Sequence, residues 1–365
     1  MNIVVLGCGA VLEQCHRRAL AMVVQKLGAR VVGLVDPNAK RLEMAKEWFP
    51  SAVGFTDAAE CFSKVRDVSL TVVTTPPPLH AAHAELAFSH GSHVLCEKPL
   101  AGTVADAEAI VACARRHKRV LSLGMTRRYY SCLVEARRCI KAGALGNKLS
   151  FAYREGGIYN WPVASAAPFN RKGSGGGVLL DKGVHALDAL CFIFGPASVG
   201  AHADDAPVQS VEANSLTTLD FGGTRGVMQL SWDMNLNSGL HVLGSMGEYW
   251  IPCGPLDLMY SRDRRNRAWT KVKIQAKWPL DLEKSNGKTG CPVDYNECFN
   301  FQLIQTLRAI SLGESPAATG EEGLATTRLI AAAYEMATPM EKPWLSKGEQ
   351  ALAVRNHWRT VKQPD

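Results

Sequence analysis

Short apolar runs alternate with longer amphipathic segments over the first third of the chain. The apolar runs predict buried strands at 2–6, 30–35, 68–74, 93–96 and 120–123. The segments between them predict helices at 11–27, 39–48, 79–90 and 104–117. Strands that alternate with helices of about 10–15 residues are typical of βαβ units, so this part of the chain is expected to form a parallel sheet.

The pattern changes after about residue 125. Segments that alternate apolar and polar residues predict strands at 148–154, 212–220, 226–232 and 240–243. Helices are predicted at 131–142, 178–194, 295–312 and 321–336, and the C-terminal tail is mixed and polar. Alternating strands joined by short turns are typical of an open, mostly antiparallel sheet.

Two domains follow from this change and from a length of 365 residues, which exceeds one ordinary core. We expect an α/β fold. A Rossmann domain, with a parallel doubly wound sheet, should occupy 1–125. A second α/β domain, with an open and mostly antiparallel sheet, should occupy 126–365.

The composition is that of an ordinary globular protein, with 47% hydrophobic and 21% charged residues. No apolar run reaches the roughly 18 residues that a membrane span needs, so no membrane partner is expected. Residues 1–6 have the pattern of a strand rather than of a signal peptide. Eleven cysteines without a C-x-x-C pair favour reduced thiols, so we predict a cytoplasmic protein.

Much of the net charge of +7 comes from the stretch 262–277, where seven basic residues accompany one acid, Asp263. A solvated surface is the simpler interpretation, and a contact for an anionic substrate or a neighbouring subunit is the alternative. No nucleic-acid-binding motif accompanies the charge, so no nucleic acid partner is expected.

The motif Gly7-Cys8-Gly9 lies between a predicted strand and a predicted helix, where a dinucleotide-binding turn belongs. Glycine permits the tight turn and the close approach of the backbone to a pyrophosphate at the helix N-terminus. The third glycine of the usual G-x-G-x-x-G pattern is absent, because position 12 is Leu12. A bulky residue there is expected to widen the contact between helix and strand.

Asp36 ends the second predicted strand, 29 residues beyond Gly7. A carboxylate at this place can accept hydrogen bonds from ribose hydroxyls and would repel a 2′-phosphate. We therefore expect NAD rather than NADP. The simpler alternative for Asp36 is a turn-forming residue before Pro37.

Polar residues also follow the third predicted strand. Thr74, Thr75 and Pro76 fall at its carboxyl end, the edge where parallel sheets bind ligands, and His80 begins the next helix. A capping role for these residues is the alternative. A rough histidine series is formed by His80, His83, His90 and His93. No carboxylate or cysteine completes a metal-binding geometry there, so no metal is expected.

Lys98 follows a predicted strand and precedes Pro99, which fixes the local backbone. A lysine at this edge can donate to a substrate hydroxyl and stabilise a developing alkoxide. A surface lysine is the alternative.

Asp181, His185 and Asp188 occupy positions i, i+4 and i+7 of a predicted helix. Residues four apart share one face, with Cβ atoms roughly 5–6 Å apart. A carboxylate beside an imidazole can orient it and support a general base near neutral pH. Asp188 is better suited to a structural hydrogen bond, and an ordinary polar helix face is the alternative for the set. The glycines at 175–177 would let the backbone pass close to a ligand.

These motifs together resemble the glucose–fructose oxidoreductase/inositol dehydrogenase family (Gfo/Idh/MocA) over nearly the whole chain. The strongest matches are Glu97-Lys98-Pro99 and the run Gly175-Gly176-Gly177-x-x-x-Asp181-x-Gly183-x-His185-x-x-Asp188. Supporting matches are Thr75-Pro76-x-x-x-His80, Arg127-Arg128-Tyr129 and Glu322-Gly323-Leu324. The departure at Leu12 concerns how tightly a cofactor is held.

The resemblance implies an N-terminal Rossmann domain and a C-terminal domain for substrate binding and oligomerisation. It also implies a homodimer or homotetramer formed through the C-terminal sheet. The family's catalytic lysine falls on Lys98, and its aspartate and histidine fall on Asp181 and His185. The cofactor set that we predict is Gly7, Cys8, Gly9, Ala10, Val11, Asp36, Thr74, Thr75, Pro76, His80, Glu97 and Lys98.

The predicted substrate set is Lys98, Arg128, Tyr159, Asn160, Trp161, Asp181 and His185. Tyr159, Asn160 and Trp161 lead into the glycine run, and aromatic faces suit the C–H faces of a sugar ring. Aromatic packing in the core or at a rim is the alternative.

The function expected from the resemblance is an NAD(P)-dependent oxidoreductase acting on a secondary hydroxyl or ketone of a sugar, sugar derivative or cyclitol. His185, held by Asp181, would take the hydroxyl proton, and Lys98 would stabilise the alkoxide; the two roles could be exchanged. One alternative is a glycosidase that uses a tightly bound NAD for oxidation and elimination. The other is a cofactor-binding regulator without catalysis, since a fold alone does not fix function.

Overall fold

The computed structural model describes residues 1–163, 166, 169–265, 268–275, 291–292 and 294–360. The chain forms two compact units. The first comprises residues 1–130 and the described part of 278–327, and the second comprises the described parts of 131–277 and 328–365. The sequence predicts one domain limit, between residues 125 and 126. It does not predict that the described part of 278–327 belongs to the first unit.

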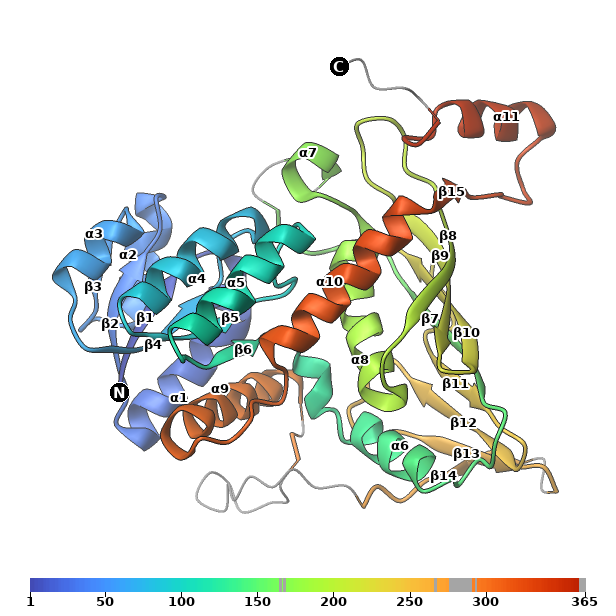
Figure 1. Cartoon of the computed structure of the whole chain (residues 1–365), viewed down its shortest axis with the longest axis horizontal. Helices are drawn as coiled ribbons and strands as arrows, with labels where there is room; N and C mark the ends of the chain where they lie inside the picture. The colour runs from blue at the N-terminus through green and yellow to red at the C-terminus, as the bar shows by residue number, and fades with distance from the viewer. Residues whose placement is uncertain (164–165, 167–168, 266–267, 276–290, 293, 361–365) are drawn as a thin grey trace. The chain divides into compact units, whose positions relative to one another are not determined.

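The first unit contains a six-stranded sheet in the order β3-β2-β1-β4-β5-β6 (Figure 1). The strands are β1 (Asn2–Leu6), β2 (Arg30–Val35), β3 (Val53–Phe55), β4 (Val68–Val73), β5 (His93–Cys96) and β6 (Leu121–Leu123). Every neighbouring pair is parallel. The predicted Rossmann architecture is confirmed, and the short strand β3 is an addition to the predicted set.

Helices connect and cover these strands. They are α1 (Arg17–Leu27), α2 (Ala39–Trp48), α3 (Ala58–Lys64), α4 (His80–Ser89), α5 (Val104–Arg116) and α9 (Tyr295–Leu312). Helix α1 packs against α9, and α4 packs against α5 (Figure 1). Local sequence sets several starts, because Asn38, Asp57, Thr103 and Asp294 each accept a backbone N–H as the N-cap. Helix α10 (Gly320–Glu335) crosses the limit between the units.

The second unit contains a nine-stranded sheet in the order β14-β13-β12-β11-β7-β10-β9-β8-β15. The strands are β7 (Ser150–Gly156), β8 (Ser198–Asp204), β9 (Asn214–Phe221), β10 (Thr224–Ser231), β11 (Gly239–Leu243), β12 (Gly247–Pro252), β13 (Tyr260–Asp263), β14 (Thr270–Lys271) and β15 (Ala337–Pro339). Only β7–β10 and β8–β15 pair in parallel. The sheet is therefore mixed and mostly antiparallel, as predicted.

Helices α6 (Ser131–Lys141) and α8 (Val184–Phe194) lie on one face of this sheet (Figure 1). Phe194 of α8 packs its ring against Phe151 of β7 and Phe221 of β9. Within the part of the chain that the structure describes, no helix covers the opposite face of the sheet (Figure 1). Two short helices, α7 (Arg171–Ser174) and α11 (Lys347–Arg355), complete the unit.

The predicted helix at 178–194 is present, but it is not a regular α-helix throughout. Its residues Leu179–Gly183 form a π-helical turn that continues into α8. A second π-helical turn, Leu12–His16, precedes α1. Such wide turns are frequent at functional sites, and both lie next to predicted site residues.

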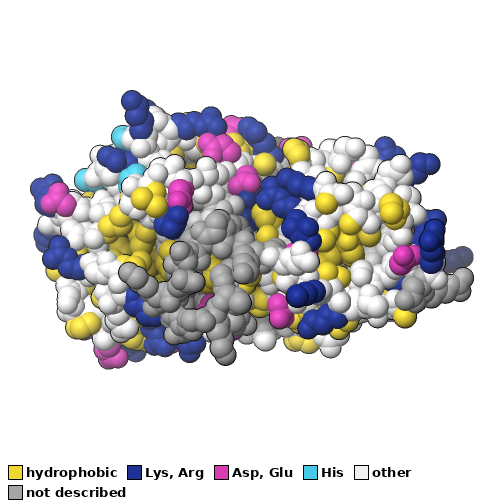
Figure 2. All heavy atoms as spheres, turned by 90° about the horizontal axis from the view of Figure 1, so that it is seen from below, with side chains coloured by type: hydrophobic (Ala, Val, Ile, Leu, Met, Phe, Trp, Pro, Cys, Tyr) yellow, Lys and Arg dark blue, Asp and Glu magenta, His cyan; other side chains and the backbone are white. Residues whose placement is uncertain are grey.

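The charge of the molecule is dispersed on the face seen in Figure 2. Lys and Arg side chains there are scattered among acidic, hydrophobic and other side chains and do not merge into one basic surface. Each helix among the described residues is too short or too polar to cross a lipid bilayer. The described residues contain no group of three or more His, Cys, Asp or Glu side chains arranged to hold a metal ion.

Candidate active site

The glycine turn is held against the carboxyl end of strand β4. Gly7 has a φ of 97°, in the region that favours glycine. A Cβ on Gly7 would lie 2.8 Å from the carbonyl carbon and oxygen of Thr74. Thr74 is buried, and its hydroxyl donates to the carbonyls of Leu6 (3.1 Å) and Gly7 (2.7 Å). Thr74 therefore holds the turn in place, while the N–H groups of Gly7 and Cys8 donate to the carbonyl of Val35 and the carboxylate of Asp36, both at 2.8 Å.

Asp36 lies directly beside this turn. Its buried carboxylate accepts the backbone N–H of Cys8 (2.8 Å) and that of Asn38 (2.8 Å). These bonds use one lone pair on each oxygen, and a carboxylate has further acceptor positions for ribose hydroxyls. The residues at the turn therefore fit a dinucleotide.

Arg41 also reaches the glycine turn, which the sequence analysis missed. A Cβ on Gly9 would lie 3.1 Å from the Nη1 atom of Arg41. Asn38 caps helix α2, and Arg41 lies in the first turn of this helix. Arg41 follows Asp36 by five residues in the sequence. Only the fold shows that its guanidinium lies beside Gly9.

Leu12, which stands at the position of the third glycine of the G-x-G-x-x-G pattern, begins the first π-helical turn. Leu12 is fully buried at the start of this turn, and His16 ends it. The wider turn accommodates the leucine and directs His16 into the interior, where its Nε2 lies 2.6 Å from the Oε1 of Glu97. The predicted widening of the contact between helix and strand stays a prediction.

Glu97 positions Lys98. Its Oε2 accepts the backbone N–H of Lys98 at 3.1 Å, and its carboxylate lies 2.9 Å from where a Cβ on Gly124 would be. Burial alone would raise the pKa of the Glu97 carboxyl, but the hydrogen bond and charge of His16, with the charge of Lys98, hold that pKa below its usual range. Glu97 is thus an ionised, buried anchor rather than a group exposed to substrate.

His80 contacts the segments that follow strands β4 and β5. Its Nε2 lies 2.8 Å from the carbonyl oxygen of Thr75, and its Nδ1 lies 3.0 Å from that of Pro99, which follows Lys98 through a cis peptide bond. The ring is fully buried, and burial lowers its pKa. His80 therefore holds the segments that follow β4 and β5 together, and its place in the cofactor set stays a prediction.

Arg128 is occupied inside the first unit. It is buried, its Nη1 donates to the carbonyl of Ala317 at 2.6 Å, and the same nitrogen lies 2.7 Å from the Oε1 of Glu322. These contacts tie the turn Thr126–Tyr129 to the start of α10. The guanidinium of Arg128 thus has partners within the protein, and the predicted substrate contact of Arg128 stays a prediction.

In the second unit, the glycine run is required by packing. A Cβ on Gly176 would overlap the Tyr334 hydroxyl, and one on Gly177 would overlap the backbone of Glu212. Gly175 has a φ of 83° and ends helix α7. The glycines at 175–177 were expected to let the backbone pass close to a ligand. In the structure, Gly176 lies close to Tyr334 and Gly177 lies close to Glu212.

Glu212 caps the helix that carries the predicted catalytic pair. Its Oε1 accepts the backbone N–H groups of Gly177 (2.9 Å) and Leu179 (3.1 Å), and the Tyr334 hydroxyl donates to the same oxygen at 2.6 Å. Arg171 lies 3.4 Å from the other oxygen. Burial raises the pKa of Glu212, partly offset by the Tyr334 hydrogen bond. Neither Glu212 nor Tyr334 carries a sequence motif that would have revealed this role.

Asp181 and His185 are half-buried on a helix whose neighbouring positions are mostly buried. Asp181 lies in the π-helical turn and His185 in the first turn of α8, so the wide turn replaces the regular spacing expected for an α-helix. Asp188 is 1% exposed, which fits the structural role expected for it.

Tyr159 lies in the same region of the second unit. Burial, followed by the charge of Asp181, raises the pKa of Tyr159. Its ring packs edge-on against Trp232 (4.9 Å between centroids) and Phe169 (5.3 Å). Asn160 and Trp161 are exposed just beyond it. Tyr159 is therefore packed against aromatic rings, as the packing alternative expects. The charge of Asp181 also acts on its phenol group.

Comparison with known proteins gives this arrangement a family. Residues 1–125 match the family described as "Oxidoreductase family, NAD-binding Rossmann fold", and residues 133–250 match the "GFO/IDH/MocA C-terminal domain". The chain belongs to the Gfo/Idh/MocA family. The resemblance inferred from the motifs is confirmed, and the first unit carries an NAD-binding Rossmann domain.

Curated relatives of this Gfo/Idh/MocA protein include dehydrogenases. It is 27% identical over 209 residues to the D-glucoside 3-dehydrogenase of Escherichia coli strain K12, covering 56% of this chain and 57% of that one. It is 25% identical over 310 residues to the scyllo-inositol 2-dehydrogenase (NADP(+)) of Bacillus subtilis strain 168, covering 81% and 84%. For three of the curated relatives, the match spans 57%, 40% and 50% of their length, which is about half.

Solved structures share the fold of this Gfo/Idh/MocA protein. A levoglucosan dehydrogenase in complex with NADH and levoglucosan has a TM-score of 0.79 at 19% identity, covering 92% of this chain and 96% of that one. An aldose-aldose oxidoreductase from Caulobacter crescentus has a TM-score of 0.76 at 23% identity, covering 92% and 97%. At these identities the likeness establishes the fold.

Proposed function

We propose that this protein is an NAD(P)-dependent oxidoreductase that transfers a hydride between the nicotinamide and a secondary hydroxyl or ketone of a sugar, sugar derivative or cyclitol. The observation that carries the proposal is the presence of a complete chemical set. The first unit supplies a dinucleotide turn and Lys98, and the second supplies the half-buried Asp181 and His185. The relatives named above are dehydrogenases, and they do not favour the glycosidase or the regulator.

The cofactor, when bound, supplies the acceptor or donor of the hydride. His185 removes the proton of the reacting hydroxyl as a general base, and the carboxylate of Asp181 orients the imidazole and supports its charged form. Lys98, held by Glu97 through its backbone N–H, donates to the reacting oxygen and stabilises its developing negative charge.

The substrate contacts that we propose are Lys98, Asp181, His185, Tyr159, Asn160 and Trp161. Trp161 is exposed, so its ring is available to the C–H face of a sugar. The raised pKa of Tyr159 keeps its phenol protonated, so it can donate a hydrogen bond to a sugar oxygen.

The preferred cofactor that we propose is NAD. The carboxylate of Asp36 stands beside Cys8 at the end of β2 and would repel a 2′-phosphate. The positive charge of Arg41, beside Gly9, would reduce this repulsion of a 2′-phosphate. The ratio of the affinities for NAD and NADP therefore has to be measured.

Two further features belong to the proposal. The uncovered face of the nine-stranded sheet is suited to a homodimer or homotetramer, and it exposes Leu216 and Leu243 (both 41%). All eleven cysteines carry free thiols, which supports work in the reducing cytoplasm.

The proposal is tested by following absorbance at 340 nm with NAD and a panel of sugars, sugar phosphates, aminosugars and cyclitols. We expect absorbance to rise with one chemical class, which would also name the substrate type. No rise with any class, in protein that binds NADH, would contradict it.

A further inference from the structure

Asp181 is linked to the cap of its helix through a single residue. Its backbone N–H donates to the carbonyl of Gly177 at 3.0 Å, and the N–H of Gly177 donates to the Oε1 of Glu212 at 2.9 Å. Glu212 is fully buried, and its own backbone carbonyl accepts the N–H of Val178 at 3.0 Å. A displacement of Glu212 is therefore transmitted to the turn that carries Asp181.

Arg171 places a positive charge beside Glu212. Its Nη2 lies 3.4 Å from the Oε2 of Glu212, and its side chain is 16% exposed. Burial raises the pKa of Glu212, the hydrogen bond from Tyr334 lowers it, the charge of Asp204 raises it, and the charge of Arg171 lowers it. Arg171 therefore favours the ionised carboxylate, and an ionised acceptor binds backbone N–H groups more strongly than a neutral one.

Two aromatic rings hold the guanidinium of Arg171. Its central carbon lies 3.8 Å from the centroid of the Trp358 ring and 5.0 Å from that of the Tyr334 ring. The two rings are almost perpendicular, at 85°, with 6.2 Å between their centroids. A guanidinium in such a corner is restricted in two directions by contacts with aromatic faces. Trp358 belongs to the C-terminal segment 356–360, which follows helix α11.

The Trp358 ring is itself anchored by a buried carboxylate. Its indole N–H donates to the Oδ1 of Asp204 at 3.2 Å and to the Oδ2 at 3.3 Å. The Nε2 of His357 lies 2.8 Å from the same Oδ1, and the Nε2 of His202 lies 3.4 Å from the Oδ2. Burial raises the pKa of Asp204, but its contacts with His202 and His357 hold that pKa below its usual range. An ionised Asp204 thus fixes the Trp358 ring beside Arg171.

We propose that Arg171 is a positioning residue of the oxidoreductase: held by Trp358 of the C-terminal segment, it orients the Glu212 cap and so sets the helix start that carries Asp181 and His185. The proposal rests on the proposed function, because only there do Asp181 and His185 act on a substrate. Arg171 acts through Glu212 and not on the reacting atoms. The C-terminal segment thereby gains a role in turnover.

The first test measures amide hydrogen exchange in the full-length protein, by mass spectrometry of the peptides that cover 177–183. Arg171→Met keeps the length of the side chain and removes its charge. We expect the protection of 177–183 to fall about tenfold or more, the effect of losing a charge-assisted pair. The fall should be larger at about pH 6 than at about pH 8, because loss of the Arg171 charge raises the pKa of Glu212. Arg171→Lys keeps the charge and should lie closer to wild type.

Variants of Trp358 test the contribution of the C-terminal segment. Trp358→Leu removes the indole beside Arg171, whereas Trp358→Phe keeps an aromatic face. We expect Trp358→Leu to reduce the protection of 177–183, and Trp358→Phe to retain more of it. Combining Trp358→Leu with Arg171→Met should add little to either change alone, because both remove the same contact. If Trp358→Leu does not fold, the comparison of Arg171→Met with Arg171→Lys decides.

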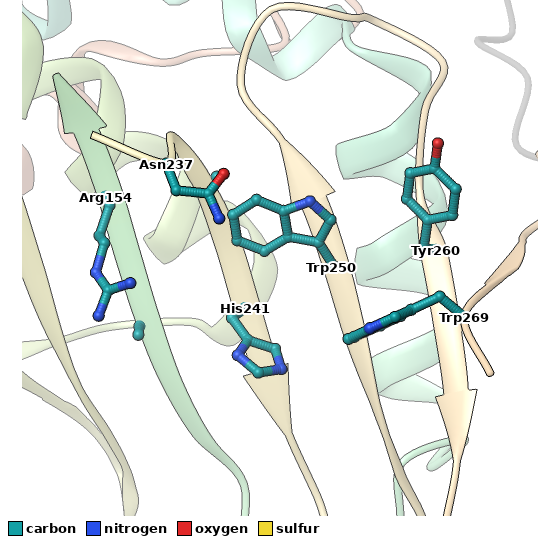
Figure 3. Close-up of a pocket in the computed structure, with 8 residues that line it drawn as sticks. Arg154, Asn237, His241, Trp250, Tyr260 and Trp269 are labelled. Carbon is teal, nitrogen blue, oxygen red and sulfur yellow. The ribbon is translucent and has the colours of Figure 1, made fainter. Parts of the chain in front are cut away.

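Trp269→Leu is the matched control. Arg262 pairs with Glu248 at 2.6 Å and lies over the Trp269 ring, 4.7 Å from its centroid. The same three residue types therefore meet at the β14 end of the nine-stranded sheet, where Trp269 lines the pocket shown in Figure 3. Its replacement removes a similar stacking contact from an arginine that pairs with Glu248 and not with Glu212. The protection of 177–183 should therefore stay unchanged.

Turnover is the second measurement, with the substrate class found at 340 nm. Arg171→Met should lower kcat about tenfold to a hundredfold, since a small misplacement of a catalytic group has this effect. The KM for the substrate and the affinity for NADH should stay unchanged, because the lost interaction supports the reaction step and not binding.

Three results would overturn the proposal: unchanged protection of 177–183 in Arg171→Met, an equal fall in Trp269→Leu, or reduced protection with an unchanged kcat. A wild-type protein that turns over no substrate, while Arg171→Met still loses protection, contradicts the proposed function. That outcome supports the link from Arg171 to the helix start, so the two failures are distinguishable.

Discussion

The buried contact between His16 and Glu97 holds the Glu97 carboxylate in place, and this carboxylate accepts the backbone N–H of Lys98. The folded-state pKa of Glu97 lies below its ordinary value of 4.5. The stabilisation from its ionised form is therefore complete above about pH 4.5 and is lost as the pH falls through the lower, folded-state value.

Replacing Glu97 by glutamine should reveal this dependence. We expect Glu97→Gln to lower the free energy of unfolding by about 1–3 kcal/mol near pH 7, because a buried partner is lost. The deficit should shrink as the pH falls below 4.5. Urea unfolding at both pH values measures it. Glu60→Gln, in an exposed pair with Lys64, is the control and should cost about 0.5 kcal/mol or less. An equal deficit at both pH values would refute the assignment.

Asp36 governs the choice of cofactor at the same scale. Asp36→Asn keeps an acceptor for the Cys8 N–H and removes the charge that repels a 2′-phosphate. We expect the preference for NAD over NADP to fall about tenfold, which corresponds to about 1.4 kcal/mol. The dissociation constants of both cofactors, measured by fluorescence, give the ratio. Asp57→Asn removes an exposed charge at the cap of α3 and should leave the ratio unchanged. An unchanged ratio in Asp36→Asn would remove Asp36 from the cofactor site.

At the scale of elements, the start of the helix at 178–194 depends on Gly177 and on the Glu212 cap. Gly177→Ala should lower the free energy of unfolding by about 3 kcal/mol, since the added methyl overlaps the Glu212 backbone. It should also reduce turnover, because Asp181 lies in the displaced turn.

Gly157→Ala is the matched control for this prediction. Its Cβ would have only the Asn235 Oδ1 nearby, at 3.8 Å, so stability should stay within about 0.5 kcal/mol of wild type. Urea unfolding of both variants decides the matter. A Gly177→Ala protein as stable as the control would show that the run is not required by packing.

How far the sequence predicts this site depends on the distance between partners along the chain. Lys98, Asp181 and His185 stand in local motifs, so their neighbourhoods in the sequence indicate them. The partner of Glu97 lies 81 residues away, and the partners of Glu212 lie 35 residues away at Gly177 and 122 residues away at Tyr334. Only the folded chain brings such pairs together.

The elements follow the same logic. Strongly apolar strands such as β1 and β4 were predicted within about one residue, because burial on both faces leaves a continuous apolar run. The short strands β3, β14 and β15 were not predicted, since so short a segment carries no period. The longer strands β8, β12 and β13 were missed as well. The π-helical turns Leu12–His16 and Leu179–Gly183 were also missed, and regular helices were predicted in their place.

At the scale of the whole molecule, the first unit is discontinuous in sequence. Thr306 of α9 donates to the hydroxyl of Ser122 at 2.9 Å, and Gln302 donates to the carbonyl of Leu123 at 3.2 Å. Helix α9 also packs along α1. A fragment ending at residue 130 would expose these surfaces.

We therefore expect the fragment 1–130 to lack a cooperative thermal transition, although it contains every strand of the parallel sheet. Circular dichroism on heating, with the full chain as the control, measures this. A fragment that melts cooperatively within about 5 °C of the full chain, a shift of roughly 1 kcal/mol, would show that α9 is dispensable.

The central claim is that Lys98 and His185 move and stabilise charge at the reacting oxygen. The most direct measurement is kcat/KM, with NAD and the substrate class found at 340 nm, for Lys98→Ala, His185→Ala and the exposed control Lys172→Ala. We predict losses of about 10²–10⁴ for the first two and none for the control, with NADH affinity retained. Losses within about tenfold of wild type for both Lys98→Ala and His185→Ala would contradict the assignment.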